Sequence, residues 1–223
     1  MKNIQEKPTV GPGANVGEIE KKEPGTRKTG LQDIENGKKN MRVIESNNFL
    51  TQRNKDFIDH IYDDRQVPFY ITPSTASKKN KKGGFIYNRN DITLCHVLLN
   101  RKEHRRDVEY SNSAILPEAI NILDNFTKKN NIKYKEVFRA ALNYTYNNGH
   151  EYGGFHVDHS YDHYQLIVYL NDCDPKSVTL IKDKNKIIKI KPKKYKGIMF
   201  KNVPHNMKFP EKGERIILVI TFK

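Results

Sequence analysis

Histidine and aspartate side chains gather in one short segment, Tyr146 to His163, which reads YNNGHEYGGFHVDHSYDH. Within it, His156 and Asp158 are separated by a single residue. On an extended strand this spacing places both side chains on the same face, so one imidazole and one carboxylate can reach a single metal ion. The pair alone is weak evidence, because the chain has eight histidines and many carboxylates, and a surface pair explains it equally well.

A further candidate ligand lies in the C-terminal segment, VPHNMKFPEKGERIILVITFK. His205 follows a short apolar run, and Arg215 opens the last apolar strand. Two imidazoles and one carboxylate on one side of an ion leave other positions open, as in the non-haem Fe(II) oxygenases that hold a chelating cosubstrate and oxygen. A buried arginine is costly without an anionic partner, and a dicarboxylate supplies one by pairing with the guanidinium fork.

The order His156, Asp158, His205, Arg215 resembles the motif of the 2-oxoglutarate and Fe(II)-dependent dioxygenases, and most closely that of the prolyl hydroxylase branch. Flanking residues extend the resemblance over about residues 137–223. The matches to the hypoxia-sensing prolyl hydroxylases are Tyr146 ahead of the first metal histidine, the Tyr-Leu-Asn of Tyr169, Leu170 and Asn171, and the approach to the distal histidine in Ile188 to Phe200.

The resemblance implies that His156, Asp158 and His205 bind Fe(II), and that 2-oxoglutarate pairs with Arg215 and touches Tyr146 and Tyr169. It also implies ascorbate as the reductant and a hydroxylated amino-acid side chain as the product, prolyl first, in a peptide or protein. One departure is that Lys176, Ser177, Val178 and Thr179 stand where the family has a glycine pair and a threonine. This departure alters the near wall of the substrate pocket but removes no ligand.

Hydrophobic periodicity indicates the elements that position these residues. Apolar stripes predict helices near 48–63 and 116–129, the second opened by Pro117. Short β-like runs follow, at Val137–Tyr146, Tyr164–Leu170, Ser177–Ile181, Lys186–Ile190, Gly197–Phe200 and Arg215–Phe222. We therefore expect a mainly β fold, a distorted double-stranded β-helix (jelly roll) core with flanking α-helices.

The expected organisation is a disordered tail over residues 1–45, rich in Pro, Gly and charge, followed by one dioxygenase domain over residues 46–223. In that domain, residues 46–131 would give helical support and residues 132–223 the β-helix core. The loop from Ile71 to Arg89 is the expected lid over the site.

Composition narrows the classes of protein. No apolar run approaches the roughly 18 residues of a membrane span, and the N-terminus lacks a secretory signal. Cys95 and Cys173 are the only cysteines, too few for a disulfide framework, which favours a reducing intracellular compartment such as the cytoplasm over secretion. The net charge of +14 favours acidic partners, either an acidic peptide segment or a nucleic acid.

Two other histidines offer an alternative metal site. His159 and His163, with Asp162, could bind zinc if their segment were helical. The preceding Gly153 and Gly154 and the β-rich run that follows leave no room for a long helix. The segment therefore predicts a loop or a pocket rim.

Two alternative functions stay open. A nucleic-acid demethylase of the AlkB type would suit the lysine-rich stretch Lys176–Lys201, but no second arginine follows Arg215 and few aromatic residues interleave with the lysines. A jelly-roll module that binds a protein or nucleic acid without catalysis is the other. Such a module has no need to retain the four-residue motif.

Overall fold

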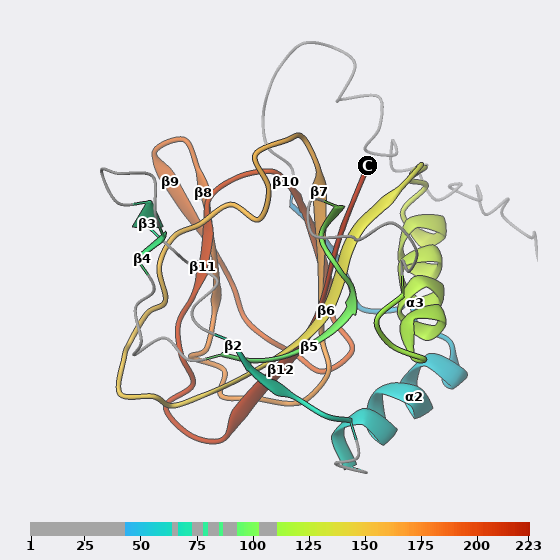
Figure 1. Ribbon diagram of the computed structural model, residues 1–223, viewed down its shortest axis with the longest axis horizontal. Helices are drawn as coiled ribbons and strands as arrows, with labels where there is room; N and C mark the ends of the chain where they lie inside the picture. Colours follow the sequence, from blue (N-terminus) through green and yellow to red (C-terminus); the bar gives the residue numbers. More distant parts are fainter. Residues whose placement is uncertain (1–42, 64–66, 73–77, 80–84, 87–92, 103–110) are drawn as a thin grey trace, which may run out of the picture.

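The computed structural model describes residues 43–63, 67–72, 78–79, 85–86, 93–102 and 111–223. The expected tail lies outside the described residues up to position 42, and so does most of the expected lid. Two antiparallel sheets face each other, and helices cover the outer face of the larger one (Figure 1). A separate two-stranded pairing joins β3, Lys78–Lys79, to β4, Phe85–Ile86.

The two helices of the described residues lie where the apolar stripes predict them. Helix α2 spans Gln52–Asp63 and helix α3 spans Leu116–Lys129, with a proline in the first turn of α3. Thr51 and Asn54 exchange side-chain to backbone hydrogen bonds of 3.2 Å at the start of α2, so two backbone N–H groups that have no partner within the helix are satisfied. Neither helix has the length and apolarity to cross a lipid bilayer.

The larger sheet has the strand order β1-β10-β7-β12-β6-β5-β2, and every neighbouring pair is antiparallel. Its strands are β1, Ile44–Ser46; β2, Tyr70–Thr72; β5, Thr93–Leu99; β6, Val137–Tyr146; β7, Tyr164–Tyr169; β10, Gly197–Lys201; and β12, Glu214–Phe222.

The smaller sheet has the order β11-β8-β9, with β8 at Thr179–Asp183, β9 at Lys186–Ile190 and β11 at His205–Met207. Strand β8 begins two residues later than expected, because the backbone N–H groups of Ser177 and Val178 bond to Asp174 and Lys176 in a turn instead. Strand β11 was not predicted, since three residues are too few to show an alternating pattern.

Alternation along the strands separates the two faces of the larger sheet. Leu166, Val168, Leu218 and Ile220 face the helices and pack with Phe126 of α3 in one apolar core. Their neighbours Ile167, Tyr169, Ile217 and Val219 face the smaller sheet and pack with Ile181 and Ile190 in a second core. The fold is a two-sheet, mainly β jelly roll with flanking helices, as expected.

Residues 46–131 contribute more than helical support. Strands β5 and β2 lie within this range and extend the larger sheet beyond β6, while β1 overlaps the end of the expected tail and pairs with β10. The apolar run around Cys95 is buried because it forms β5 between two neighbouring strands. The larger sheet therefore includes strands from before residue 132, where the β-helix core was expected to begin.

Candidate metal centre

A two-residue backbone bridge brings the two candidate metal histidines together. The backbone N–H of His156 donates to the carbonyl of His205 over 3.1 Å, and the N–H of His205 donates to the carbonyl of His156 over 2.9 Å. His205 lies at the start of β11, whereas His156 lies in an irregular loop that meets β11 and the residue after it through isolated bridges at His156 and Tyr152. His156 and Asp158 therefore do not lie on one extended strand, the case in which their spacing would place both side chains on one face, because Asp158 lies at a bend after the bridge.

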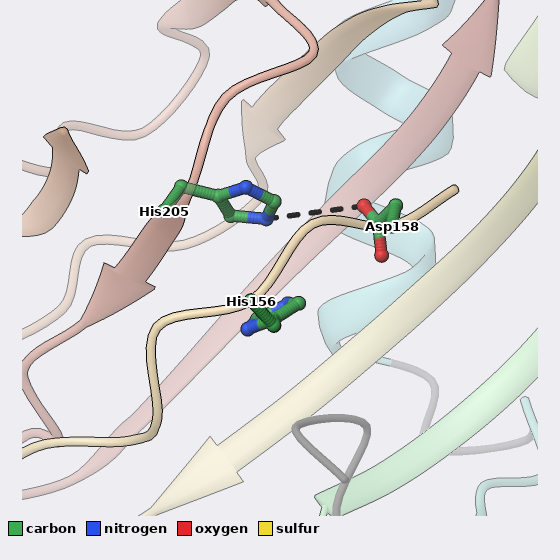
Figure 2. A group of neighbouring side chains, drawn as sticks. All are labelled: His156, Asp158 and His205. Atoms are coloured by element: carbon green, nitrogen blue, oxygen red, sulfur yellow. Dashed lines mark ion pairs between the residues drawn. The ribbon is translucent and has the colours of Figure 1, made fainter. Parts of the chain in front are cut away.

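The bend turns the Asp158 carboxylate towards the two imidazoles (Figure 2). One ligand atom from each of His156, Asp158 and His205 lies within 4.8 Å of the others. The Nε2 atom of His205 is 3.8 Å from an oxygen of Asp158, and the two imidazole rings are 4.5 Å apart between centroids. These three residues are the group of potential metal ligands found among the described residues.

Backbone carbonyls fix which ring nitrogen of each histidine is free. The Nδ1 atom of His156 is 3.0 Å from the carbonyl oxygen of Gly154, and that of His205 is 3.1 Å from the carbonyl oxygen of Val203. A carbonyl can only accept, so Nδ1 carries the proton in each neutral ring and Nε2 keeps its lone pair. This arrangement is the usual second layer around a metal-binding histidine.

Burial and nearby charges set the pKa values of Asp158 and His205. Burial, the largest single effect, raises the pKa of Asp158, but Arg139 at 3.7 Å, the two imidazoles and Arg101 together outweigh it and hold this pKa well below its usual range. Burial, with a smaller effect from His156, lowers the pKa of His205 to about 4. Near neutral pH Asp158 is therefore ionised and His205 neutral, which are the protonation states that metal ligands require.

Arg215 lies in the same cavity, with neutral neighbours only. Its side chain is 2% exposed, one terminal nitrogen donates to Thr179 over 2.9 Å, and the other is 3.2 Å from the sulfur of Met207. Its Nε atom is buried with no hydrogen-bond partner, and no carboxylate in the described residues pairs with it. A buried, unpaired guanidinium is costly, so the position fits a bound carboxylate.

Tyr169 lies directly behind this arginine. Its hydroxyl is 2.6 Å from the Thr179 hydroxyl, and the Arg215 guanidinium lies 5.5 Å from the centre of its ring. Tyr169 is not among the residues that line the cavity. It therefore orients Thr179 and Arg215 in the metal-free protein.

The cavity lies between the two sheets, with walls from both and from the loop of His156. Its lining residues are Thr93, Arg139, Asn143, Thr145, Gly153, Gly154, His156, Asp158, Gln165, Ile167, Thr179, His205, Asn206, Met207, Phe209, Arg215, Ile217 and Val219. The three candidate ligands and Arg215 thus share one cavity.

Tyr146, which the resemblance places beside oxoglutarate, is not among the residues that line this cavity. Asn143 and Thr145 of β6 line the cavity, and alternation places Tyr146 on the opposite face of the strand, where it is 38% exposed and next to Tyr144. A match in sequence spacing misses this, because a shift of one residue changes the face on which a side chain lies.

His159 and His163 lie in a loop as expected, but they are buried rather than on a rim. The Nε2 atom of His159 is 2.8 Å from the Thr221 hydroxyl, and its ring stacks on Tyr161 at 4.7 Å between centroids. The ring of His163 meets His159 edge-on. Asp162, the third proposed zinc ligand, is largely exposed and faces Lys201 at 4.0 Å.

Arg139 and Gln165 are two polar cavity residues that the sequence did not single out. Arg139 lies in the apolar first half of β6, and Gln165 lies on the inward face of the apolar strand β7. This interruption of the apolar alternation is the signal that could have found them.

The donor set and its surroundings fit Fe(II) and 2-oxoglutarate. Two imidazoles and one carboxylate on one side suit non-haem Fe(II), and the buried Arg215 with its unpartnered Nε suits one end of a dicarboxylate. The residues present would therefore accommodate both groups.

Comparison with known proteins finds matches in structure only. No family model and no curated protein sequence matches the chain. A 2OG-Fe(II) oxygenase family oxidoreductase from Burkholderia pseudomallei superposes with a TM-score of 0.61 at 11% identity, over 81% of this chain and 84% of that one.

Two further solved structures are similar. A prolyl hydroxylase from Trichoplax adhaerens, in complex with a hypoxia-inducible factor peptide fragment, gives a TM-score of 0.50 at 16% identity over 81% of this chain and 82% of that one. The non-haem alpha-ketoglutarate-dependent carbocyclase SnoK of nogalamycin biosynthesis gives 0.54 at 4% identity over 82% and 79%. The chain therefore has the fold of the 2-oxoglutarate and Fe(II)-dependent oxygenases.

Proposed function

We propose that this protein is a 2-oxoglutarate- and Fe(II)-dependent dioxygenase that hydroxylates an amino-acid side chain in a peptide or protein. Among the possible side chains, we favour that of proline. The observation that carries the proposal is the presence of a buried arginine without a carboxylate partner in the same cavity as a His-Asp-His cluster. An ordinary structural arginine would have an anionic partner, and an ordinary structural histidine pair would not share a site with a buried carboxylate whose oxygen lies within 4.8 Å of a ring nitrogen of each.

In this proposal, His156, Asp158 and His205 hold the ion, and Arg215 with Thr179 holds the far carboxylate of oxoglutarate. Bound Fe(II) would supply the oxygen activation that hydroxylates a C–H bond while oxoglutarate becomes succinate and carbon dioxide. The chain itself fixes the ligand tautomers through Gly154 and Val203 and keeps the Asp158 carboxylate ionised beside Arg139. Ile217 and Val219 give the cavity an apolar wall that restricts water.

A peptide substrate is supported by the Trichoplax prolyl hydroxylase, which was solved with a peptide bound. An acidic peptide is supported by six exposed lysines on the β8–β9 hairpin and the turn after it, none of which has an ion pair among the described residues: Lys182, Lys184, Lys186, Lys189, Lys191 and Lys193. Charge of one sign on this surface would favour encounter with acidic segments.

The test is oxoglutarate turnover by the purified full chain with Fe(II) and ascorbate. We expect succinate formation above that of His156→Ala and Asp158→Ala proteins, and a gain of one oxygen on a proline of a peptide substrate, located by mass spectrometry. Equal succinate in the wild-type and variant proteins, across peptide and nucleic-acid substrates, would contradict the proposal and favour a non-catalytic binding module.

The same lysines would also serve a demethylase acting on nucleic acid. A gel-shift measurement at two salt concentrations separates the two partners, because phosphate binding weakens steeply between about 50 and 200 mM salt. Retention of oligonucleotide at the lower salt, with oxoglutarate turnover stimulated by methylated oligonucleotide and not by peptide, would favour the demethylase.

A further inference from the structure

Gln165 contacts the metal-facing nitrogen of a candidate ligand. Its side chain is 2% exposed, lies on β7 and lines the cavity. Its amide nitrogen Nε2 is 3.1 Å from Nε2 of His205. Ile167 and Tyr169, which follow it on the same face of the strand, belong to the apolar core, so a polar side chain at this position requires an explanation.

The tautomer of His205 determines which way the Gln165 amide points. Because Nδ1 of His205 donates to the carbonyl of Val203, Nε2 of the neutral ring has only a lone pair to offer. Gln165 must therefore present its NH₂ group to His205. The amide oxygen Oε1 is then turned elsewhere, buried and without a hydrogen-bond partner among the described residues.

The same lone pair is the one that a metal ion would use. Figure 2 shows the Nε2 side of His205 directed towards Asp158, and Gln165 Nε2 reaches this same atom. A nitrogen with a single lone pair cannot accept a hydrogen bond and bind an ion at once. The amide of Gln165 and a metal ion therefore compete for His205.

We propose that Gln165 is a positioning residue of the metal centre, whose amide caps Nε2 of His205 and must be released into the cavity for an ion to bind there. The NH₂ group of the released amide can then donate to the cosubstrate carboxylate or to water, whereas its unpartnered Oε1 can accept from water. This inference rests on the proposed function.

The expected effect on binding follows from the loss of one hydrogen bond. Replacing Gln165 by methionine keeps the length and volume of the side chain but removes both polar groups. Cobalt(II) should then bind about two- to tenfold more tightly, because no amide has to be displaced. Oxoglutarate should bind the cobalt-loaded variant about two- to tenfold more weakly, because the released donor is missing.

Titration of the full chain with cobalt(II), followed by visible absorption, tests the competition. The matched control is Thr221→Val. Thr221 is fully buried and lies opposite Gln165 on β12. Its replacement also removes one hydrogen bond to a histidine, but that histidine, His159, is not a candidate ligand. We expect tighter cobalt binding in Gln165→Met and unchanged binding in Thr221→Val. Equal or weaker binding in Gln165→Met overturns the proposal.

A second measurement uses the unaltered protein. The side-chain NH₂ resonances of Gln165 in an NMR spectrum should shift when zinc(II) is added, and again when oxoglutarate follows. Resonances that stay in place on zinc binding overturn the release of the amide. If the wild-type chain binds no more cobalt than a His156→Ala variant, both the metal site and the proposed function are wrong. If the wild-type chain binds cobalt and the Gln165→Met variant binds it with the same affinity, only this inference is wrong.

Discussion

At the scale of single residues, the buried guanidinium of Arg215 contacts neutral groups and has no carboxylate partner among the described residues. Thr179, Met207 and the ring of Tyr169 contact its guanidinium, and all three are neutral. These contacts therefore offset only part of the cost of desolvating this charge, and a carboxylate in the cavity would offset more of it.

The Arg215→Met variant should lose oxoglutarate binding. Truncating one side of a buried charge pair costs about 2–5 kcal/mol, which raises the Kd for oxoglutarate by about 30-fold or more. Arg215→Lys should lose less, because it keeps the charge but not the fork. Calorimetry on the manganese-loaded protein measures both, and manganese binding itself should be unchanged in the two variants. Equal oxoglutarate affinity in wild type and Arg215→Met would show that the diacid binds elsewhere.

The two tyrosines named by the resemblance should differ in their effects. Tyr169→Phe removes the hydroxyl that holds Thr179, and a lost hydrogen bond of this kind costs about 0.5–1.5 kcal/mol, so oxoglutarate should bind about two- to tenfold more weakly. Tyr146→Phe is the matched control and should bind oxoglutarate as the wild type does, because Tyr146 does not line the cavity. A loss in Tyr146→Phe as large as that in Tyr169→Phe would mean that the loaded site differs from the metal-free one.

At the scale of elements, the position of α3 on the larger sheet depends on Gly197. A Cβ atom at this position would lie 2.8 Å from the ring of Phe126 and 2.9 Å from that of Phe49. Those rings pack edge to face, at 5.1 Å between centroids, in the core beneath the helix. The absence of a side chain thus lets the helix approach β10 closely.

Gly197→Ala should therefore lower the free energy of unfolding. Overpacking of a dense core typically costs about 1–3 kcal/mol, and denaturant unfolding measures the loss. Phe126→Leu in the same background should recover part of it, which a double-mutant cycle would detect as a coupling energy. Purely additive losses would show that the alanine methyl is accommodated by a shift of β10 rather than by the ring.

The loop that holds His156 is a second case in which an element needs a glycine. A Cβ atom on Gly153 would lie 2.9 Å from the Asn206 side chain, and the Gly153 N–H donates to the carbonyl of Met207 over 3.1 Å. Close contact of this loop with β11 is what allows the bridge between His156 and His205 to form three residues later.

At the scale of the whole molecule, the cavity lies between the two sheets and takes residues from both. His156 and Asp158 come from the loop between β6 and β7, His205 from the smaller sheet, and Arg215 from a central strand of the larger sheet. A ligand bound to all of them would link the sheets, so metal binding should be coupled to global stability.

Addition of manganese(II) should therefore raise the Tm of the full chain. At a free ion concentration of about 100 times Kd, binding to the folded state alone adds about 2.7 kcal/mol, or a rise of about 5–10 °C for a chain of this size. Differential scanning fluorimetry with and without a chelator measures the change. The His156→Ala protein should show no rise, and a rise of equal size in that variant would place the ion at another site.

The sequence by itself predicted which residues share the cavity and most of the elements. His156, Asp158, His205 and Arg215 were grouped by their types and order, and the fold brings all four into one cavity. Strands β6 and β9 and helix α3 also follow, since alternation and helical stripes are local properties of the chain.

Only the tertiary structure decided which other side chains face the ligands. The sequence does not reveal the bridge between His156 and His205, because it joins a loop to a three-residue strand distant along the chain. It also cannot tell that Tyr146 points away while Gln165 contacts His205, because the face a side chain occupies depends on strand register, and register is set by pairing between strands that are far apart in sequence.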